Sequence, residues 1–265
     1  MIIKSRTKQG KAGRLWVFAG IILVAIASYF IATHWLARKA VAPVALNKFP
    51  VSGNVQEPEM ANVNGEEETE APLPPTKLLP VPFTPQAPTA NWDELHNEAC
   101  EEASALMADA YFSGNHESTL SPEYAEAEIA KLTEWEKQNF GYYLSITTEE
   151  AAKMMEEVYG LSTIIVQFPS PDELKRQLAD GNLVILPANG QLLGNPNYKQ
   201  PGPIYHMLVI KGYDRIGFIT NDPGTKRGLN YAYDYDTLKN AAGTWNHAEH
   251  AVNLNEKSVI IVYKE

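Results

Sequence analysis

The chain has 265 residues, enough for a membrane-spanning segment, a linker and one domain with a proper core. Residues 1–14 carry five basic side chains and no acid, so the net charge of −10 leaves −15 for the rest of the chain. An acidic body argues against nucleic acid as a partner. A single cysteine excludes an internal disulfide. The sequence contains no phosphate-binding loop and no CxxC pair, so nothing in it indicates a nucleotide site or a structural zinc.

Residues 15–36 form an apolar run without Asp, Glu, Lys or Arg, and 22 residues in a helix match a bilayer core of roughly 30 Å. Basic residues precede this run, which predicts a cytoplasmic N-terminus and an extracytoplasmic body. The small residues 40–42 could serve as a cleavage site. Because the run is longer than a usual signal core, we favour an uncleaved, single-pass anchor in the cell membrane.

Residues 37–76 are rich in Pro and Asn and include the acidic run 66–70, with no apolar periodicity to build a core. This composition predicts a disordered linker. A flexible chain of this length spans on the order of 35 Å, enough to hold a domain away from a membrane. The domain itself is expected at residues 77–265.

The domain pattern predicts an extended strand at 78–83, because alternate prolines forbid a helix. Caps, prolines and glycines then mark four helices and a short apolar strand. Two strands at 206–213 and 217–220 have hairpin spacing, and a late helix and a final strand follow. The predicted helices lie at 100–113, 121–139, 147–159, 170–179 and 235–241, and the other predicted strands lie at 163–167, 183–186 and 258–263. Helices dominate the first half and strands the second, so we expect an α+β fold with N-terminal helices packed on a mainly antiparallel sheet.

The only cysteine, Cys100, lies where a helix is expected to begin. The unpaired N–H groups and the dipole of a helix start favour a thiolate, so the position suits a nucleophile. Taken alone, Cys100 fits a small buried apolar residue better.

A thiol nucleophile needs a base, and the base needs a group that fixes its tautomer. His206 opens one strand of the hairpin and Asp222 ends the next, so the tight connection is expected to bring them together. Asn221 is the adjacent candidate, and neighbouring strand residues face opposite ways. Taken separately, His206 fits a strand-end histidine and Asp222 a turn former equally well.

Other histidines give weaker signals. His247 and His250 have the spacing of a metal pair, but two ligands without a third are weak evidence for zinc. His96 and His116 flank the Cys100 helix and are expected at the surface, with His96 a candidate to line a cleft.

From Val81 onward the chain resembles the C39-like cysteine peptidases, which have a papain-like fold. Residues 81–86 are similar to the family's opening strand with its glutamine, and Cys100 with Ala103, Leu106 and Met107 to its nucleophile helix. Residues 205–214 resemble its histidine strand and residues 221–223 its acid turn.

The resemblance implies Cys100 as nucleophile, His206 as general base and then acid, Asp222 as the orienting group and Gln86 as the donor to the oxyanion. It implies no cofactor and no metal. The chain departs from the family at Glu101 and Glu102, where glycine usually follows the cysteine. Carboxylates there raise the pKa of the thiol unless they point away along the helix. The stretch between Gln86 and Cys100 is also longer than in leader-processing members, which could displace the glutamine.

The sequence therefore predicts a membrane-anchored, extracytoplasmic cysteine peptidase that acts on a peptide or protein substrate through a thioester. Two alternatives stay open. A papain-like cell-wall amidase would use the same order of residues, and a silent binding domain of the same fold would carry a thiol that its acidic neighbours deactivate.

Overall fold

The computed structural model describes residues 72–264. The predicted basic N-terminus, the membrane span and residues 37–71 of the linker lie outside these residues. Within the described part, none of the helices combines the length and the apolar character that a bilayer crossing requires.

Helices predominate in the first half of the described domain, as the sequence predicts. Five of them confirm predicted helices, whereas two short ones, α2 and α7, were not expected. The helices are α2 (Glu94–Asn97), α3 (Cys100–Phe112), α4 (Pro122–Asn139), α5 (Thr148–Tyr159), α6 (Pro171–Ala179), α7 (Gly190–Leu193) and α8 (Tyr235–Ala241).

The helix starts follow from capping chemistry. Thr147 and Ser170 each accept a hydrogen bond from the third helical N–H, and the glutamate at that position bonds back, so α5 and α6 begin with complete capping boxes. Gly160 ends α5 in the left-handed conformation with φ 65°. Helix α3 differs because its N-cap, Ala99, offers no side-chain acceptor. The free N–H groups of its first turn therefore depend on backbone, neighbouring side chains or ligands.

All strand pairs in the main seven-stranded sheet are antiparallel, which confirms the predicted sheet type. The order is β2-β9-β3-β4-β5-β6, with β1 also paired to β4, and β7 with β8 forms a separate hairpin. The predicted opening strand is shorter than expected, because only its start pairs as β1. The strands are β1 (Lys77–Leu78), β2 (Ser162–Gln167), β3 (Leu183–Ala188), β4 (His206–Tyr213), β5 (Phe218–Asn221), β6 (Tyr231–Tyr233), β7 (Thr244–Asn246), β8 (Ala251–Asn253) and β9 (Ser258–Tyr263).

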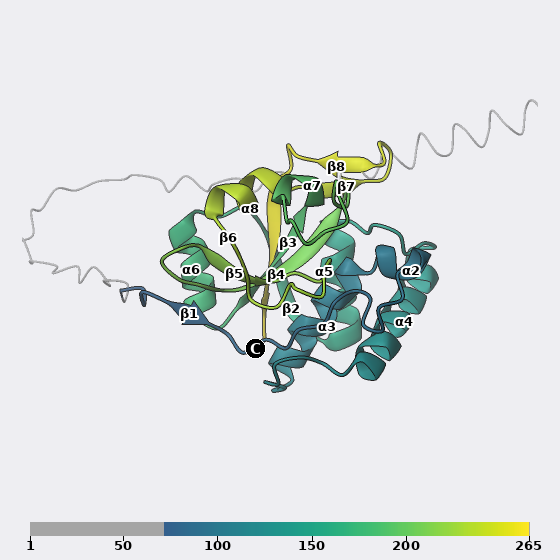
Figure 1. The fold of residues 1–265 in the computed structure, drawn as a ribbon, viewed down its shortest axis with the longest axis horizontal. Helices are drawn as coiled ribbons and strands as arrows, with labels where there is room; N and C mark the ends of the chain where they lie inside the picture. The colour runs from purple at the N-terminus through teal and green to yellow at the C-terminus, as the bar shows by residue number, and fades with distance from the viewer. Residues whose placement is uncertain (1–71, 265) are drawn as a thin grey trace, which may run out of the picture. The chain divides into compact units, whose positions relative to one another are not determined.

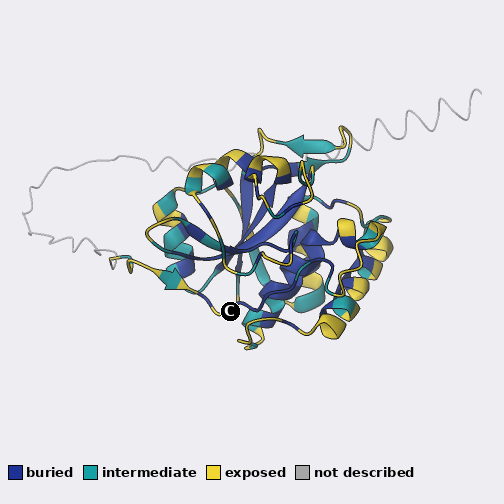
Figure 2. Ribbon diagram, in the orientation of Figure 1, coloured by how far each residue is buried: buried dark blue, intermediate teal, exposed yellow. Residues whose placement is uncertain are grey.

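The sheet lies between helical layers (Figure 1). Helix α3 packs on β4, α5 packs on β2 and β9, and α6 packs on β3 and β4. Strands β3 and β4 are buried along their whole length, and Figure 2 shows the central strands in the colour of buried residues. This burial on both faces explains the apolar runs without alternation at 183–186 in β3 and 207–210 in β4.

Strand β4 also anchors the segment that precedes α2. Buried Lys211 lies at a β-bulge and donates from Nζ to the Val81 carbonyl at 3.1 Å. Asn221, at the end of β5, donates from Nδ2 to the carbonyls of Val81 and Pro82, each at 3.1 Å. These bonds satisfy buried backbone carbonyls and hold the chain that leads to Gln86 against the sheet.

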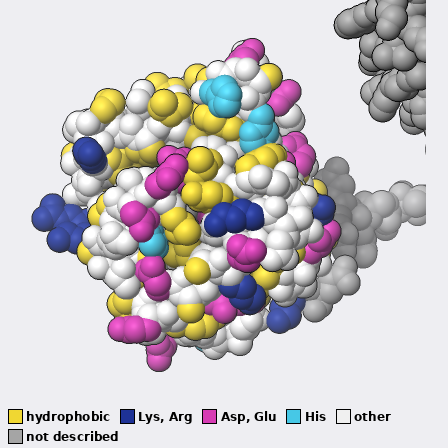
Figure 3. Space-filling model, turned by 90° about the vertical axis from the view of Figure 1, so that its right-hand side faces the viewer, with side chains coloured by type: hydrophobic (Ala, Val, Ile, Leu, Met, Phe, Trp, Pro, Cys, Tyr) yellow, Lys and Arg dark blue, Asp and Glu magenta, His cyan; other side chains and the backbone are white. Residues whose placement is uncertain are grey.

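Figure 3 views the face that carries α2 and α4. Acidic, basic and apolar side chains are interspersed on this face, and no continuous basic patch lies on this side of the described domain.

Candidate active site

Cys100 is the first residue of α3 and is only 4% exposed. Its thiol donates a hydrogen bond to Oε2 of Glu101 at 2.9 Å. The other oxygen of Glu101 accepts from the backbone N–H of Ile146 at 3.1 Å, in the turn that leads into α5. Glu101 is therefore fixed beside the sulfur and does not point away along the helix.

The surroundings of Cys100 oppose a thiolate. Burial raises the pKa of the Cys100 thiol well above its ordinary value, and the charge of Glu101 raises it further. Burial likewise raises the pKa of Glu101, and the nearby charge of Glu102 adds to that effect. The resting site therefore holds a protonated thiol, although the helix dipole acts in the opposite direction.

His206 and Asp222 form a buried pair, as the hairpin spacing predicted. Nε2 of His206 lies 2.8 Å from Oδ1 of Asp222, and the two side chains are 1% and 0% exposed. An ionised carboxylate only accepts hydrogen bonds, so the neutral imidazole carries its proton on Nε2. Nδ1 is then a lone-pair acceptor, and it has no hydrogen bond to another side chain within the described domain.

Five donors converge on the carboxylate of Asp222. Besides His206, the backbone N–H of Gly224 bonds to Oδ1 at 3.0 Å. Oδ2 accepts from Tyr198 at 2.6 Å, Tyr233 at 2.7 Å and Asn195 at 3.0 Å.

Burial acts to raise the pKa of Asp222, but the charge and hydrogen bond of His206 and the two tyrosine hydroxyls lower it to about 2. The carboxylate therefore stays ionised at every physiological pH.

Asn221, the other candidate for orienting His206, faces the opposite side of the strand. Its Nδ2 bonds to the opening segment, as described above, and not to the imidazole. The alternation of side chains along β5 separates the two residues, so only Asp222 contacts His206.

Gln86 lies between the acid turn and the start of α3. Its backbone N–H donates to the Pro223 carbonyl at 2.9 Å, and its Nε2 donates to the carbonyls of His96 and Asn97 at 2.9 and 3.0 Å. Both amide hydrogens are therefore committed. Oε1 of Gln86 is buried and has no partner within the described domain.

His96 is buried, which corrects the expectation of a surface residue. Its Nδ1 lies 2.7 Å from Asp93 and its Nε2 lies 2.8 Å from Glu126 on α4. The two carboxylates clamp the ring, and the clamp fixes the long stretch between Gln86 and Cys100 against α4. His96 does not bond to Cys100 or His206.

Helix α3, which Cys100 opens, packs on strand β4, which His206 opens. Tyr205, directly before His206, is buried, and its pKa is raised by burial and then by the charges of Glu101 and Cys100. The thiol hydrogen is nevertheless directed to Glu101, so no hydrogen bond joins Cys100 to His206.

Two further buried acids, Glu102 on α3 and Glu136 on α4, face each other. Glu102 accepts from Thr133 at 3.0 Å, and neither acid forms an ion pair within the described domain. Burial raises the pKa of Glu136 to about 11 and that of Glu102 to about 7. The pair therefore holds at least one proton at neutral pH.

This pair predicts a pH dependence of stability. Both pKa values are higher in the folded than in the unfolded chain, so the stabilisation is complete below the ordinary value near 4.5 and is lost as pH rises through about 7 for Glu102. Between pH 5 and pH 8, we expect Glu136→Gln to lose less free energy of unfolding than the wild type does. The difference should be about 1–3 kcal/mol. Urea unfolding at both pH values measures this difference.

Glu134→Gln, on the exposed face of the same helix, is the control and should leave the pH dependence unchanged. An unchanged pH dependence in Glu136→Gln as well would show that the pair does not carry a buried proton.

The candidate metal pair has another role. His247 lies in the turn between β7 and β8, and its Nε2 lies 3.0 Å from the Tyr142 hydroxyl and 3.2 Å from Glu150 on α5. Tyr142 also bonds to Glu150. His250 packs against Trp245 instead. No group of three metal-ligating side chains occurs among residues 72–264.

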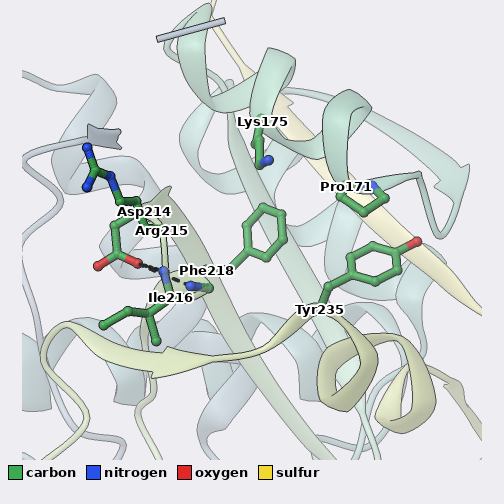
Figure 4. Close-up of a pocket in the computed structure, with 8 residues that line it drawn as sticks. Pro171, Lys175, Asp214, Arg215, Ile216, Phe218 and Tyr235 are labelled. Carbon is green, nitrogen blue, oxygen red and sulfur yellow. Dashed lines mark hydrogen bonds between the residues drawn. The ribbon is translucent and has the colours of Figure 1, made fainter. Parts of the chain in front are cut away.

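A surface pocket lies at the other end of β4 from His206 (Figure 4). Lys175, Phe218 and Tyr235 line it together with the β4–β5 turn. Asp214 in that turn accepts from the N–H groups of Ile216 and Gly217, so its carboxylate closes the turn. The pocket is separate from the Cys100 and His206 residues.

Three residues of the site, Asn195, Tyr198 and Tyr233, were not predicted as site residues. Tyr233 lies at the end of the short strand β6. No local signal in the sequence marks Asn195 or Tyr198, because both reach Asp222 from an irregular segment after α7.

Comparisons with known proteins place the chain in a family. No curated protein matches it. Among solved structures, a C39-like peptidase from Bacillus anthracis is similar at 15% identity and a TM-score of 0.45, over 72% of this chain and 98% of that one. The model of the Peptidase_C39 like family matches residues 78–252, well over half of the chain, and the chain therefore belongs to that family.

Proposed function

We propose that this protein is a membrane-anchored, extracytoplasmic cysteine peptidase that hydrolyses peptide or amide bonds. The observation that carries the proposal is the buried His206–Asp222 pair at the start of β4, the strand on which the Cys100 helix packs. Membership of the Peptidase_C39 like family supports a peptidase-type site. Neither a cofactor nor a metal is required.

In the proposed reaction, Sγ of Cys100 attacks the substrate carbonyl carbon while Nδ1 of His206 accepts the thiol proton. Asp222 stabilises the imidazolium that forms. The proton passes to the leaving amine, the C–N bond breaks, and an acyl thioester remains on Cys100. Water, deprotonated by His206, then hydrolyses the thioester and restores the thiol. Because burial and Glu101 disfavour a resting thiolate, proton transfer accompanies the attack.

Gln86 is the proposed side-chain donor to the oxyanion. Its backbone bond to Pro223 supports this role, because the bond keeps Gln86 beside the acid turn. To act as a donor, Nε2 must leave the carbonyl of His96 or Asn97, and the two hydrogen bonds to these carbonyls oppose that movement.

The membrane location rests on the sequence. The apolar run 15–36 with basic residues before it supports a single-pass anchor with the domain outside. Because the linker would hold the domain near the membrane, the peptide or protein substrate is expected near the membrane surface. Because the domain is acidic, we do not expect nucleic acid as a partner.

A silent binding domain is the second candidate, and the hydrogen bond from Cys100 to Glu101 favours it. The experiment that separates the candidates incubates the full chain in detergent with a peptide library and, separately, with peptidoglycan. Mass spectrometry then identifies cleavage products. Peptide cleavage that Cys100→Ala abolishes supports the peptidase, and release from peptidoglycan alone supports an amidase. Binding without cleavage supports the silent domain.

The third member of the site is testable through a pair of neighbouring variants. Asp222→Ala should lower kcat/KM on the order of 10²–10⁴-fold, because the imidazole loses the group that fixes its tautomer. Asp222→Asn should cost less, since an amide can still orient the ring. Asn221→Ala should instead lower stability by about 1–3 kcal/mol, because two buried carbonyls lose their donor. A larger loss of kcat/KM per folded molecule in Asn221→Ala would reverse the assignment.

A further inference from the structure

The carboxylate of Asp222 is shared unequally between two sets of donors. Oδ1 faces His206 and the Gly224 N–H, whereas Oδ2 faces Asn195 and two tyrosine hydroxyls. A buried carboxylate needs donors on both oxygens, but the backbone or a single amide would satisfy the second oxygen. Two phenol hydroxyls, at 2.6 and 2.7 Å, donate to this one oxygen in addition to the Asn195 amide. Burial of the carboxylate alone does not require both of them.

The two tyrosines come from different parts of the chain and meet at Asp222. Tyr198 follows α7 and packs edge-on against the His206 ring, with ring centroids 5.4 Å apart. Tyr233 lies on β6, and its hydroxyl is 3.5 Å from that of Tyr198. Asn195 donates to Asp222 and to the Tyr233 hydroxyl and so joins the group.

Hydrogen bonds to a carboxylate withdraw charge from it. Short phenol bonds to Oδ2 therefore weaken the attraction of Asp222 for a second proton on His206, while Oδ1 still holds Nε2–H in place. An imidazole that is held in orientation but less strongly drawn toward the imidazolium keeps its Nδ1 lone pair more readily. A general base needs that lone pair.

We propose that Tyr198 and Tyr233 are positioning residues that hold Asp222 through Oδ2, and so keep Nε2–H of His206 directed at Oδ1 while weakening the attraction of the carboxylate for a second proton on the ring. The inference rests on the proposed function, since it assigns a role within the same site. The two tyrosines act through Asp222 and do not touch the thiol.

Other groups near the pair complete its electrostatic environment. Tyr231 on β6 stacks beside Tyr233, with ring centroids 4.8 Å apart, and makes no hydrogen bond to Asp222. Tyr205 precedes His206 and interacts electrostatically with Glu101 and Cys100 of α3. Arg227 contacts the outer part of the network through Asn197 at 3.4 Å. Tyr231 therefore provides a matched control on the same strand.

The test uses the full chain in detergent with ¹⁵N-labelled histidine. The ring ¹⁵N shifts of His206 are followed with pH in wild type, Tyr198→Phe, Tyr233→Phe and the control Tyr231→Phe. Each phenylalanine keeps the ring and removes one donor. We expect the midpoint at which His206 takes up its second proton to rise by about half a unit to one unit in Tyr198→Phe and Tyr233→Phe, a three- to tenfold change in proton affinity, and to stay unchanged in Tyr231→Phe.

A second measurement separates positioning from general loss of structure. In an Asp222→Asn background the charge is absent, so Tyr198→Phe should no longer move the midpoint. The proposal is overturned by unchanged midpoints in Tyr198→Phe and Tyr233→Phe, by an equal rise in Tyr231→Phe, or by a shift that persists without the Asp222 charge. The titration needs no turnover, so absence of hydrolysis in every variant would count against the proposed function and not against this inference.

Discussion

Replacement of Cys100 by alanine is expected to lower kcat/KM for peptide cleavage by on the order of 10³ or more, since the thioester cannot form. The fold should survive, because Cys100 is small and its thiol bonds only to Glu101. The measurement is the initial rate of product formation, with circular dichroism to confirm that the variant is folded.

Ser104→Ala is the matched control for Cys100→Ala. Ser104 is buried one turn further along α3, and its hydroxyl has no partner within the described domain. Its removal should leave cleavage near the wild-type rate. Retention of cleavage by Cys100→Ala would mean that another residue is the nucleophile.

Replacement of Glu101 by glutamine is expected to make Cys100 more reactive. An amide cannot ionise, so no negative charge can develop beside the sulfur, and its oxygen can still accept from the Ile146 N–H. The pKa of the thiol should fall by one unit or more, which raises the rate of iodoacetamide alkylation at pH 7.5 by about tenfold or more. The measurement is the pH dependence of the alkylation rate at Cys100.

Glu102→Gln tests whether the effect is specific. Glu102 also lies in the first turn of α3, but its carboxyl faces Thr133 and Glu136. Its replacement should change the alkylation rate less than Glu101→Gln does. An alkylation midpoint in the wild type that already lies below the free-thiol value of about 8.5 would contradict the assigned role of Glu101.

Local sequence signals predicted most of the fold. The caps at Ser121, Thr147 and Ser170 and the glycine after α5 set helix ends within a residue or two of the observed bounds. The α+β architecture, with helices packed on a mainly antiparallel sheet, is confirmed. The short helices α2 and α7 and the β7–β8 hairpin were missed, because segments of three or four residues carry too little periodicity to be recognised.

The candidate site was predictable only where two residues share a local motif. The hairpin spacing predicted that His206 and Asp222 lie together, and the structure shows this contact. The choice between Asn221 and Asp222 needed the strand register, because neighbouring side chains face opposite ways. The side-chain directions of Glu101 and Gln86 were not predictable, since both depend on partners far along the chain or in irregular backbone. The clamp on His96 depends in the same way on Glu126 of another helix.

The most direct test of the account is the detection of a covalent acyl group on Cys100. The full chain is mixed with a peptide that it cleaves, quenched in acid, digested and analysed by mass spectrometry. The account predicts an acyl adduct on the peptide that contains Cys100, absent in Cys100→Ala and formed far more slowly in His206→Ala. Turnover without an adduct at Cys100, or an adduct that forms as fast without His206, would contradict it.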